Sequence, residues 1–356
     1  MTDLPETMSG VLLTRHGGPE ALVWRSDLPV PRPGPGQVLV QVLAAGVNNT
    51  DINTRIGWYA ADITGATDSG AVGQDGGHAG ALDFPRIQGG DLCGRVVALG
   101  EGVSGFPIGT RVTCALNLPR PTIDAPTAYI ALGSERDGAF AQFCLLDVAD
   151  LFDVTDSPLS DVEIAAMPCA FGTALNLLTR AGVKAGQTVL VTGASGGVGL
   201  AAVQLAAHFG ARVTAIAAPA KAQAVRTAGA TTVLPRDTTP PADSFDVVID
   251  LVAGPGWSAL IAALKPGGHY ATSGAIAGPM VTADLRQIYL RDITIHGCTF
   301  TPRSTFAKLV DQIRSGTLRP LISATYPLDQ IHTAQARFME KSLPGKIVLL
   351  PPEIPQ

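Results

Sequence analysis

One stretch of the chain constrains its fold more than any other: an apolar run that ends in a glycine-rich turn and leads into a helical pattern. The run covers residues 188–191, and the turn carries Gly193, Gly196 and Gly199. Strand, tight turn and helix together make the first unit of a doubly wound α/β domain. Glycines at this spacing let a pyrophosphate reach the helix N-terminus, where free N–H groups and the helix dipole favour negative charge. A second apolar strand follows at residues 211–217, so we expect a dinucleotide site here.

Composition narrows the classes of partner. With 356 residues, 46% of them hydrophobic, the chain can bury a sizeable core and is expected to form two domains. A net charge of −5 and 15% charged residues provide no basic field for nucleic acid. There is neither a secretory signal pattern nor an apolar run long enough to span a bilayer. We expect a cytoplasmic protein that binds neither nucleic acid nor membrane.

The first part of the chain is rich in short, strand-like segments separated by Gly and Pro turns, which predicts an all-β, barrel-like domain. Segments of this kind are residues 10–14, 37–45, 93–100 and 111–115. A long segment at residues 60–88 is rich in Gly, Ala and Asp and has no helical or alternating pattern. It is either a lid over a site or an insertion without a role, and its His78 is expected to be solvated.

The pattern changes at residue 160, where a Ser-x-x-Glu capping box opens a helix. Apolar strands then alternate with helices, as a mostly parallel sheet requires. The residues from 303 onward are expected to return to the first domain. We therefore predict a β domain of residues 1–160 plus 303–356 and a dinucleotide-binding domain of residues 161–302.

Five motifs spread over nearly the full length carry a family resemblance. They are Gly-Val-Asn-Asn-Thr-Asp at 46–51, Gln-Gly-Gly-Asp at 88–91, Gly-Ala-Phe-Ala at 138–141, Ala-Ser-Gly-Gly-Val-Gly at 194–199 and Gly-Lys-Ile-Val-Leu at 345–349. In these motifs the chain resembles the medium-chain dehydrogenase/reductase superfamily, and looks most like its zinc-independent quinone oxidoreductase (zeta-crystallin-like) branch. The resemblance implies an α/β fold: a Rossmann-type doubly wound parallel sheet plus a GroES-like, β-barrel-type catalytic domain.

The resemblance also addresses zinc. The zinc-dependent alcohol dehydrogenases place a Cys where this chain has Asn48, and a His followed by Glu where it has Gly90 and Asp91. Only Cys169 still matches a ligand position, whereas a catalytic zinc needs about three protein ligands and a water. The five cysteines include no C-x-x-C pair for a structural zinc. We predict no metal, and expect Cys169 to be a buried small residue near the cofactor.

The end of the second strand of the nucleotide unit indicates which cofactor is used. In NAD enzymes this strand ends in an Asp or Glu that takes the ribose 2′-hydroxyl. Here it ends at Ala217 with no carboxylate, and Lys221 follows. In zinc-free relatives a Lys at this position pairs with the 2′-phosphate, and Arg236 can supply a second contact. We predict NADPH rather than NADH.

The other cofactor contacts follow from the resemblance. They are Thr173, Ser195, Gly196, Gly197, Val198, Ala217, Val252, Ser273, Gly274, Phe300 and Lys346.

Reduction of a quinone or an activated alkene creates negative charge on oxygen, which needs hydrogen-bond donors or a proton. Asn48 can donate through its amide, and Thr50 matches the hydroxyl that relays a proton in the zinc enzymes. Tyr59 lies at a spacing that resembles that of the proposed proton donor of enoyl-thioester reductases. Quinone reductases also often carry an aromatic residue there, so roles as proton donor, pocket wall and unrelated loop residue all stay open. Asp51 is expected to hold the loop.

The predicted activity is an NADPH-dependent, zinc-independent reduction of small-molecule quinones or α,β-unsaturated carbonyls. One alternative is a 2-enoyl-thioester (enoyl-CoA) reductase, for which Arg32, Arg55 and Arg86 lie in the substrate half. A zinc alcohol dehydrogenase and a non-catalytic, NADPH-binding crystallin-like protein are the others. The resemblance further implies a homodimer or homotetramer, paired through residues 293–298.

Overall fold

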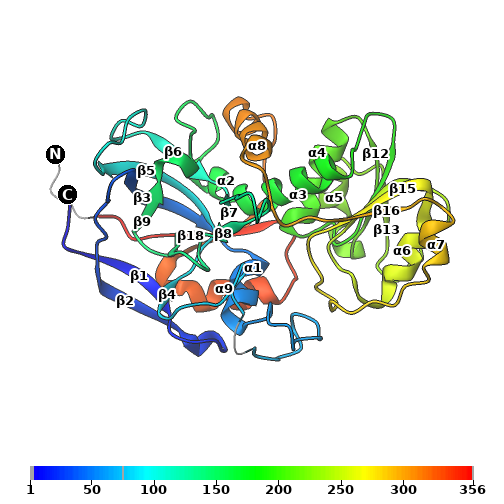
Figure 1. Ribbon diagram of the computed structural model, residues 1–356, viewed down its shortest axis with the longest axis horizontal. Helices are drawn as coiled ribbons and strands as arrows, with labels where there is room; N and C mark the ends of the chain where they lie inside the picture. The colour runs from blue at the N-terminus through cyan, green and yellow to red at the C-terminus, as the bar shows by residue number, and fades with distance from the viewer. Residues whose placement is uncertain (1–3, 74–75, 355–356) are drawn as a thin grey trace.

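The structure, a computed structural model, describes residues 4–73 and 76–354. Its strands form two large sheets that occupy opposite ends of the long axis of the molecule (Figure 1). Among the described residues, no helix combines the length and the apolar character needed to cross a membrane.

The first sheet has seven strands in the order β10-β6-β5-β3-β18-β17, and β9 also pairs with β3. These strands are β3 (Gln37–Gly46), β5 (Asp91–Leu99), β6 (Arg111–Cys114), β9 (Phe143–Asp147), β10 (Leu151–Asp153), β17 (Ile322–Pro327) and β18 (Lys346–Leu350). Beside it lie a three-stranded sheet and a hairpin, made of β1 (Thr7–Leu13), β2 (Leu22–Pro29), β4 (Arg86–Ile87), β7 (Asn117–Pro119) and β8 (Tyr129–Ala131). Near the C-terminus the chain returns to this sheet, where β18 pairs with both β3 and β17.

The second sheet is parallel throughout, with the strand order β13-β12-β11-β14-β15-β16. Its strands are β11 (Thr188–Val191), β12 (Arg212–Ile216), β13 (Thr232–Leu234), β14 (Phe245–Asp250), β15 (Leu264–Thr272) and β16 (Thr294–Gly297). The order reverses direction at β11, as in a doubly wound fold, so ligands are expected at the carboxyl ends of the strands beside it.

Helices cover both faces of this parallel sheet. Val189 and Val191 of β11 face a core that includes residues of α3, α4 and α8, whereas Leu190 between them faces a second core with Trp257 of α6. Burial on both faces is why these strands are continuous apolar runs. The helices are α1 (Asn49–Ile56), α2 (Asp161–Ala165), α3 (Pro168–Arg180), α4 (Gly197–His208), α5 (Ala222–Thr227), α6 (Trp257–Ala263), α7 (Arg286–Tyr289), α8 (Arg303–Ser315) and α9 (Ile331–Met339).

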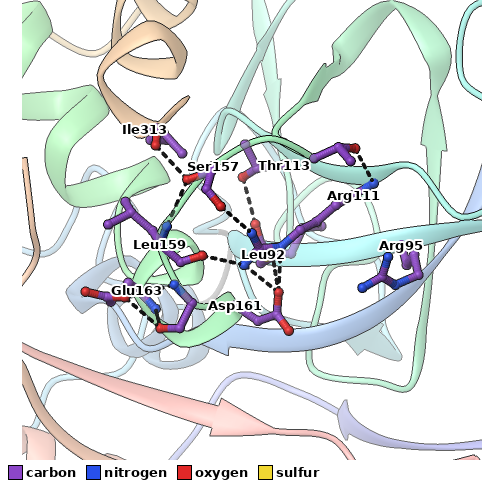
Figure 2. A network of polar contacts seen from close by, with 12 residues as sticks. Leu92, Arg95, Arg111, Thr113, Ser157, Leu159, Asp161, Glu163 and Ile313 are labelled. Atoms are coloured by element: carbon purple, nitrogen blue, oxygen red, sulfur yellow. Dashed lines mark hydrogen bonds and ion pairs between the residues drawn. The ribbon is translucent and has the colours of Figure 1, made fainter. Parts of the chain in front are cut away.

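A polar network fixes the crossing of the chain from the first sheet to the second (Figure 2). Arg111 of β6 donates from Nε to Asp161 Oδ1 at 2.6 Å and from Nη2 to the carbonyl of Leu159 at 2.8 Å. Ser157 Oγ donates to the carbonyl of Ile313 in α8 at 2.6 Å. One guanidinium and one hydroxyl therefore tie β6, the linking segment and α8 together.

The predicted capping box is present. Ser160 Oγ accepts from the N–H of Glu163 at 3.2 Å, and the Glu163 carboxylate accepts from the N–H of Ser160 at 2.8 Å. Several elements were not predicted, among them the short strand β4 and helix α1, which starts at Asn49 directly after β3. Helix α1 matters most, because it carries much of the site described below.

Candidate active site

The glycine-rich turn lies between β11 and α4, at the carboxyl edge of the parallel sheet. Gly193 has a φ of 57°, and a Cβ at Gly199 would lie 2.3 Å from the Gly193 carbonyl oxygen, so both positions require glycine. Helix α4 starts at Gly197 after Gly196, which makes no side-chain capping bond. The first N–H groups of α4, including that of Val198, therefore have no cap from Gly196.

The C-terminal strand reaches this turn. The N–H of Gly345 donates to the carbonyl of Ser195 at 3.1 Å. The Lys346 side chain passes Gly197 so closely that a Cβ on Gly197 would lie 2.8 Å from Lys346 Cδ. The structure thus brings the predicted residues Ser195, Gly197 and Lys346 together across the junction of the two sheets.

A buried carboxylate organises the neighbouring strand ends. Asp250, at the end of β14, accepts from the hydroxyls of Thr192 and Tyr270, each at 2.5 Å. It also accepts from the backbone N–H groups of Val252 at 2.9 Å and Ala253 at 3.2 Å. Ala253 has a φ of 53°, which a non-glycine residue adopts only when its surroundings fix it. Asp250 therefore shapes the turn that carries the predicted cofactor residue Val252.

Ser273 follows β15 at the same edge. Its Oγ is buried and has no hydrogen-bond partner in the described part of the chain, and Gly274 stands beside it. A buried hydroxyl without a protein partner fits a site that a polar ligand completes.

The predicted phosphate contacts lie on the far side of the turn. Ala217 directly follows β12, and its N–H donates to the carbonyl of Leu234 at 3.1 Å. Lys221 is only 8% exposed, and its Nζ donates to the carbonyl of Lys341. Burial lowers the pKa of Lys221, and repulsion from Arg236 lowers it further. Lys221 and Arg236 thus lie close enough to repel each other, an arrangement that an anion would relieve.

A second polar cluster, almost fully buried, stands behind the turn. Lys346 Nζ donates to Asn48 Oδ1 at 2.5 Å and forms an ion pair with Asp91 Oδ2 at 3.1 Å. Asn48 Nδ2 donates to the same Asp91 oxygen at 2.8 Å, and Asp91 Oδ1 accepts from the N–H of Cys169 at 2.6 Å. Both ends of the Asn48 amide are therefore bonded to the protein. The sequence predicted Asn48 as a donor to substrate; here its visible role is to hold this network.

Tyr59 lies near this network, close enough to Cys169 for the thiol to influence its pKa. Burial raises the pKa of Tyr59, and the polar side chains of Thr50 and Asn53 act in the opposite direction. Burial also raises the pKa of Cys169 to about 12, and the Thr50 side chain acts in the opposite direction here as well. Two predicted residues, Thr50 and Tyr59, are thus brought together beside Cys169.

His78 differs from its expectation. The sequence predicts a solvated side chain, but the His78 ring packs edge-on against Tyr59 at 5.0 Å between centroids and against Tyr129 at 5.6 Å. Burial lowers its pKa to about 4, so the imidazole is neutral at pH 7. From its composition, this segment was expected to be exposed to solvent. In the structure, two aromatic rings that are distant in sequence supply an apolar surface against which the imidazole packs.

A small cavity of about 20 Å³ opens next to Cys169. It is lined by Ala115, Leu116, Asn117, Pro168, Cys169, Gly172, Thr173, Thr301 and Phe306. This places the predicted residue Thr173 at the same point as the thiol. Phe300, next to Thr301, is held there by its carbonyl, which accepts from Asn176 Nδ2 at 3.1 Å.

Sequence reasoning missed three groups of residues. Asp250 could have been found, since a carboxylate at the end of an apolar strand is an unusual residue to bury. Asp91 was noted only as a replaced ligand position. Lys341 and Asn53 belong to no motif, Asn49 was given no role within the 46–51 motif, and only the fold joins the three by hydrogen bonds.

Two family profiles match the chain: "Alcohol dehydrogenase GroES-like domain" at residues 34–156 and "Zinc-binding dehydrogenase" at residues 197–315. The crystal structure of a proposed alcohol dehydrogenase from Sinorhizobium meliloti is 41% identical, with a TM-score of 0.90 and 99% of each chain covered. Acryloyl-coenzyme A reductase from Metallosphaera sedula is 29% identical, covering 90% of this chain and 93% of the relative. Quinone oxidoreductase from Sus scrofa is also 29% identical, covering 96% and 98%.

These matches extend over both sheets and agree with the fold, the glycine-rich turn and the C-terminal strand that reaches it. They confirm a Rossmann-type sheet joined to a GroES-like domain and the oxidoreductase chemistry of nicotinamide enzymes. The chain belongs to the medium-chain dehydrogenase/reductase superfamily.

Proposed function

We propose that this protein is an NADPH-dependent, zinc-independent reductase of quinones or α,β-unsaturated carbonyl compounds. The observation that carries the proposal is the burial of Tyr59 close enough to Thr50 and Cys169 for both to influence its pKa, with a cavity at Cys169. A buried proton donor at this point can serve a substrate that gains a hydride and a proton.

The residues fit a nicotinamide dinucleotide. The N-terminus of α4 and the glycine-rich turn would hold the pyrophosphate, and the unpartnered Ser273 hydroxyl is available at the strand ends. Lys221 and Arg236 would hold a 2′-phosphate, which favours NADPH over NADH. When bound, the reduced nicotinamide supplies the hydride.

The polar cluster behind the turn is a poor ligand set for a catalytic zinc. Asn48 and Asp91 are bonded to the Lys346 ammonium, whose positive charge would repel a metal ion. Cys169 is the one thiol beside this cluster, whereas a catalytic zinc needs about three protein ligands. At Gly90, a Cβ would lie 2.3 Å from Leu116 Cδ1, so Leu116 occupies the space that a longer side chain needs.

Tyr59 would act as the proton donor. Reduction of the conjugated double bond adds a hydride to one atom and a proton to another. The Tyr59 O–H bond breaks, its proton goes to the substrate, and the electron pair stays on the phenolate oxygen until solvent restores the proton. Removal of such a positioned acid typically lowers rates by about 100- to 10 000-fold.

The test is turnover of NADPH by the purified protein with a metal chelator present. An ortho-quinone and a simple enone are the acceptors, and NADH replaces NADPH in parallel. We expect turnover that survives the chelator and is much weaker with NADH. Tyr59→Phe should lower kcat by about 100-fold or more. Tyr326→Phe, which removes a hydroxyl from β17, is the matched control and should not.

Three results would count against the proposal. Activity lost on chelation and restored by zinc would return the alcohol dehydrogenase alternative. Equal use of NADH would remove the phosphate role of Lys221 and Arg236. Tight NADPH binding without turnover of any acceptor would indicate a non-catalytic, crystallin-like protein.

A 2-enoyl-thioester substrate is the second candidate, because acryloyl-coenzyme A reductases are among the relatives. Not all of the arginines that the sequence analysis named for binding a CoA arm are available for that role. Arg55 is buried and donates to the carbonyl of Gly17 at 2.9 Å, and Arg86 pairs with Asp137 at 2.9 Å. Arg32 is exposed. Acryloyl-CoA belongs in the same assay, and a kcat/KM well above that of the free enone would favour this candidate.

A further inference from the structure

The chain leaves helix α1 in a loop whose two ends meet. Gly57 and Gly73 pass each other so closely that a Cβ on Gly73 would lie 2.3 Å from the Gly57 carbonyl oxygen. The N–H of Gly73 also donates to the carbonyl of Ile56 at 2.9 Å. We call residues 60–72 the strap. The strap leaves the end of α1 and returns to it at one point, as an Ω-loop does.

The strap is bonded to its own base. Trp58 Nε1 donates to the carbonyl of Gly65, in the middle of the strap, at 3.1 Å. Short turns at residues 60–63 and 66–69 are each closed by a backbone hydrogen bond of 3.1 Å. Gly57, at the base, has a φ of 67°. A loop with internal bonds and small residues at both ends can swing as one body, because the end residues absorb the change in backbone angles.

The far side of the strap touches the unit that contains the parallel sheet. The N–H of Thr67 donates to the carbonyl of Ile276 at 3.2 Å, and Thr67 is only 4% exposed. A Cβ on Gly278 would lie 3.8 Å from the Thr64 carbonyl oxygen, which is an ordinary contact distance. In the described part of the chain, the Thr67–Ile276 bond is the only hydrogen bond between the strap and this unit. We call this bond the latch.

The latch lies beside the predicted cofactor residues. Ile276 comes shortly after Ser273 and Gly274, in the loop that joins β15 to α7 (Figure 1). The N–H of Ala277 donates to the carbonyl of Val252 at 2.9 Å, so this loop packs on the turn that follows β14. The carboxyl ends of these strands are where a doubly wound sheet binds its ligand. The strap therefore reaches the edge of the expected dinucleotide site.

The part of the chain after the strap is held more firmly. The N–H of His78 donates to Ser134 Oγ at 2.9 Å, and the Tyr129 hydroxyl donates to the carbonyl of His78 at 3.1 Å. The N–H of Ala79 donates to Glu135 Oε1 at 2.8 Å. These bonds tie residues 78 and 79 to β8 and the turn after it, whereas one backbone bond holds the far side of the strap. Movement is therefore expected in the strap.

We propose that the strap is a gate for the nicotinamide dinucleotide, which enters and leaves its site when the latch opens. The strap has a defined path, a glycine at each end and a single hydrogen bond to the other unit, at the edge where the ligand is expected. The inference uses only the binding of a dinucleotide, which family membership implies. It does not depend on which acceptor is reduced.

Thr67→Pro tests the latch, because proline has no N–H to donate. Thr67→Val is the matched control, since it keeps the backbone N–H and the shape of the side chain. Binding is followed by stopped-flow fluorescence with whichever of NADPH and NADH binds more tightly. We expect Thr67→Pro to raise the association and dissociation rate constants together, each by about three- to tenfold, the weight of one hydrogen bond. Kd should stay within about twofold, because a gate that must open in both directions slows entry and exit equally. Thr67→Val should match wild type.

Hydrogen exchange in the protein without cofactor shows whether the strap alone has changed. In Thr67→Pro the amides of residues 60–72 should exchange faster, whereas those of α1 and β15 should exchange as in wild type. Trp58→Phe is a second variant, which removes the indole N–H from Gly65 and leaves the backbone unchanged. It should raise both rate constants as well, by about two- to threefold.

A rise in the dissociation rate constant alone, with Kd weakened by the same factor, would show that the strap holds the cofactor and does not gate it. Unchanged rate constants in both variants, or strap amides that exchange as in wild type, would also overturn the gate. So would equal rate changes in Thr67→Val, whose latch is intact. None of these outcomes concerns the acceptor, so turnover of quinones and enones tests the proposed function separately.

Discussion

Asp51 shows how one buried side chain holds the loop that begins α1. Its Oδ2 accepts from the N–H of Asn48 at 2.7 Å, and its carbonyl accepts from Gln88 Nε2 at 2.9 Å. Burial raises the pKa of Asp51 to about 7; the N–H of Asn48 acts against this shift, while Asp91 adds to it. The carboxyl is therefore easier to bury protonated than ionised.

This shift has a defined sign for stability. Between the ordinary pKa of 3.8 and the folded value of about 7, the folded chain binds more protons at Asp51 than the unfolded chain does. The contribution of Asp51 to the free energy of unfolding therefore falls as the pH rises through that window, by about 4 kcal/mol at most. Asp51→Asn keeps an acceptor for Asn48 and cannot ionise. We expect the stability of Asp51→Asn relative to wild type to increase as the pH rises from about 4.5 to about 7.5, which spans most of that window. Urea unfolding at each pH measures this difference. Parallel curves for the two proteins would show that Asp51 does not titrate with this shift.

At the residue scale, the sequence identified positions better than roles. Asn48, Thr50, Tyr59 and Lys346 all lie at one place, and that juxtaposition followed from motifs. The partners of the Asn48 amide could not be predicted from motifs, because Asp91 and Lys346 reach it from strands β5 and β18, which are distant in sequence. His78 was misjudged for the same reason: local composition carries no information about the Tyr59 and Tyr129 rings that cover it.

At the scale of elements, the carboxyl edge of the parallel sheet depends on Asp250. Its carboxylate joins β11, β14 and β15 through Thr192 and Tyr270 and also fixes the turn at Val252 and Ala253. It is fully buried. If an amide N–H group replaced one of its oxygens, a buried donor would face another donor.

We expect Asp250→Asn to destabilise the protein by about 2–4 kcal/mol, since at least one donor loses its partner in a buried site. Because the turn at Val252 would shift, NADPH binding should weaken as well. Denaturant unfolding and a fluorescence titration with NADPH measure the two effects. Tyr270→Phe removes only one donor and leaves the turn bonded, so it should cost about 1 kcal/mol and leave NADPH affinity near wild type. Equal stability of Asp250→Asn and wild type would contradict this account.

The sequence predicted a strand correctly where the strand is buried on both faces, as in β11 and β14, because burial on both faces requires an uninterrupted apolar run. Helix α1 could not be predicted from the sequence pattern. Its sequence, Asn-Thr-Asp-Ile-Asn-Thr-Arg-Ile, has only two apolar residues, yet Asp51, Asn53, Thr54 and Arg55 are buried. A helix that buries polar side chains against a polar network has no apolar stripe for a pattern to detect.

On the scale of the whole molecule, the active site exists only because two sheets meet. The N-terminal unit supplies α1 with Tyr59 shortly after it, the parallel sheet supplies the glycine-rich turn, and β18 returns with Lys346 to touch both (Figure 1). The motifs predicted each part, and the order of strands in the two sheets explains why they converge.

The far edge of the parallel sheet leads to the last prediction. Strand β16 is the end strand of its sheet, and Ile295 on it is exposed, as are Leu285, Tyr289 and Leu290 in and beside α7. An open strand edge next to exposed apolar side chains is a surface that soluble proteins usually cover. We propose that a second copy of this chain pairs with β16, as the family resemblance predicts. Light scattering should then give at least twice the mass of one chain, and Ile295→Asp combined with Leu290→Asp should give a monomer that still binds NADPH. Ile123→Asp, at an equally apolar but distant exposed position, should leave the assembly unchanged. A wild-type monomer, or dissociation by Ile123→Asp to the same extent, would show that this edge is not the interface.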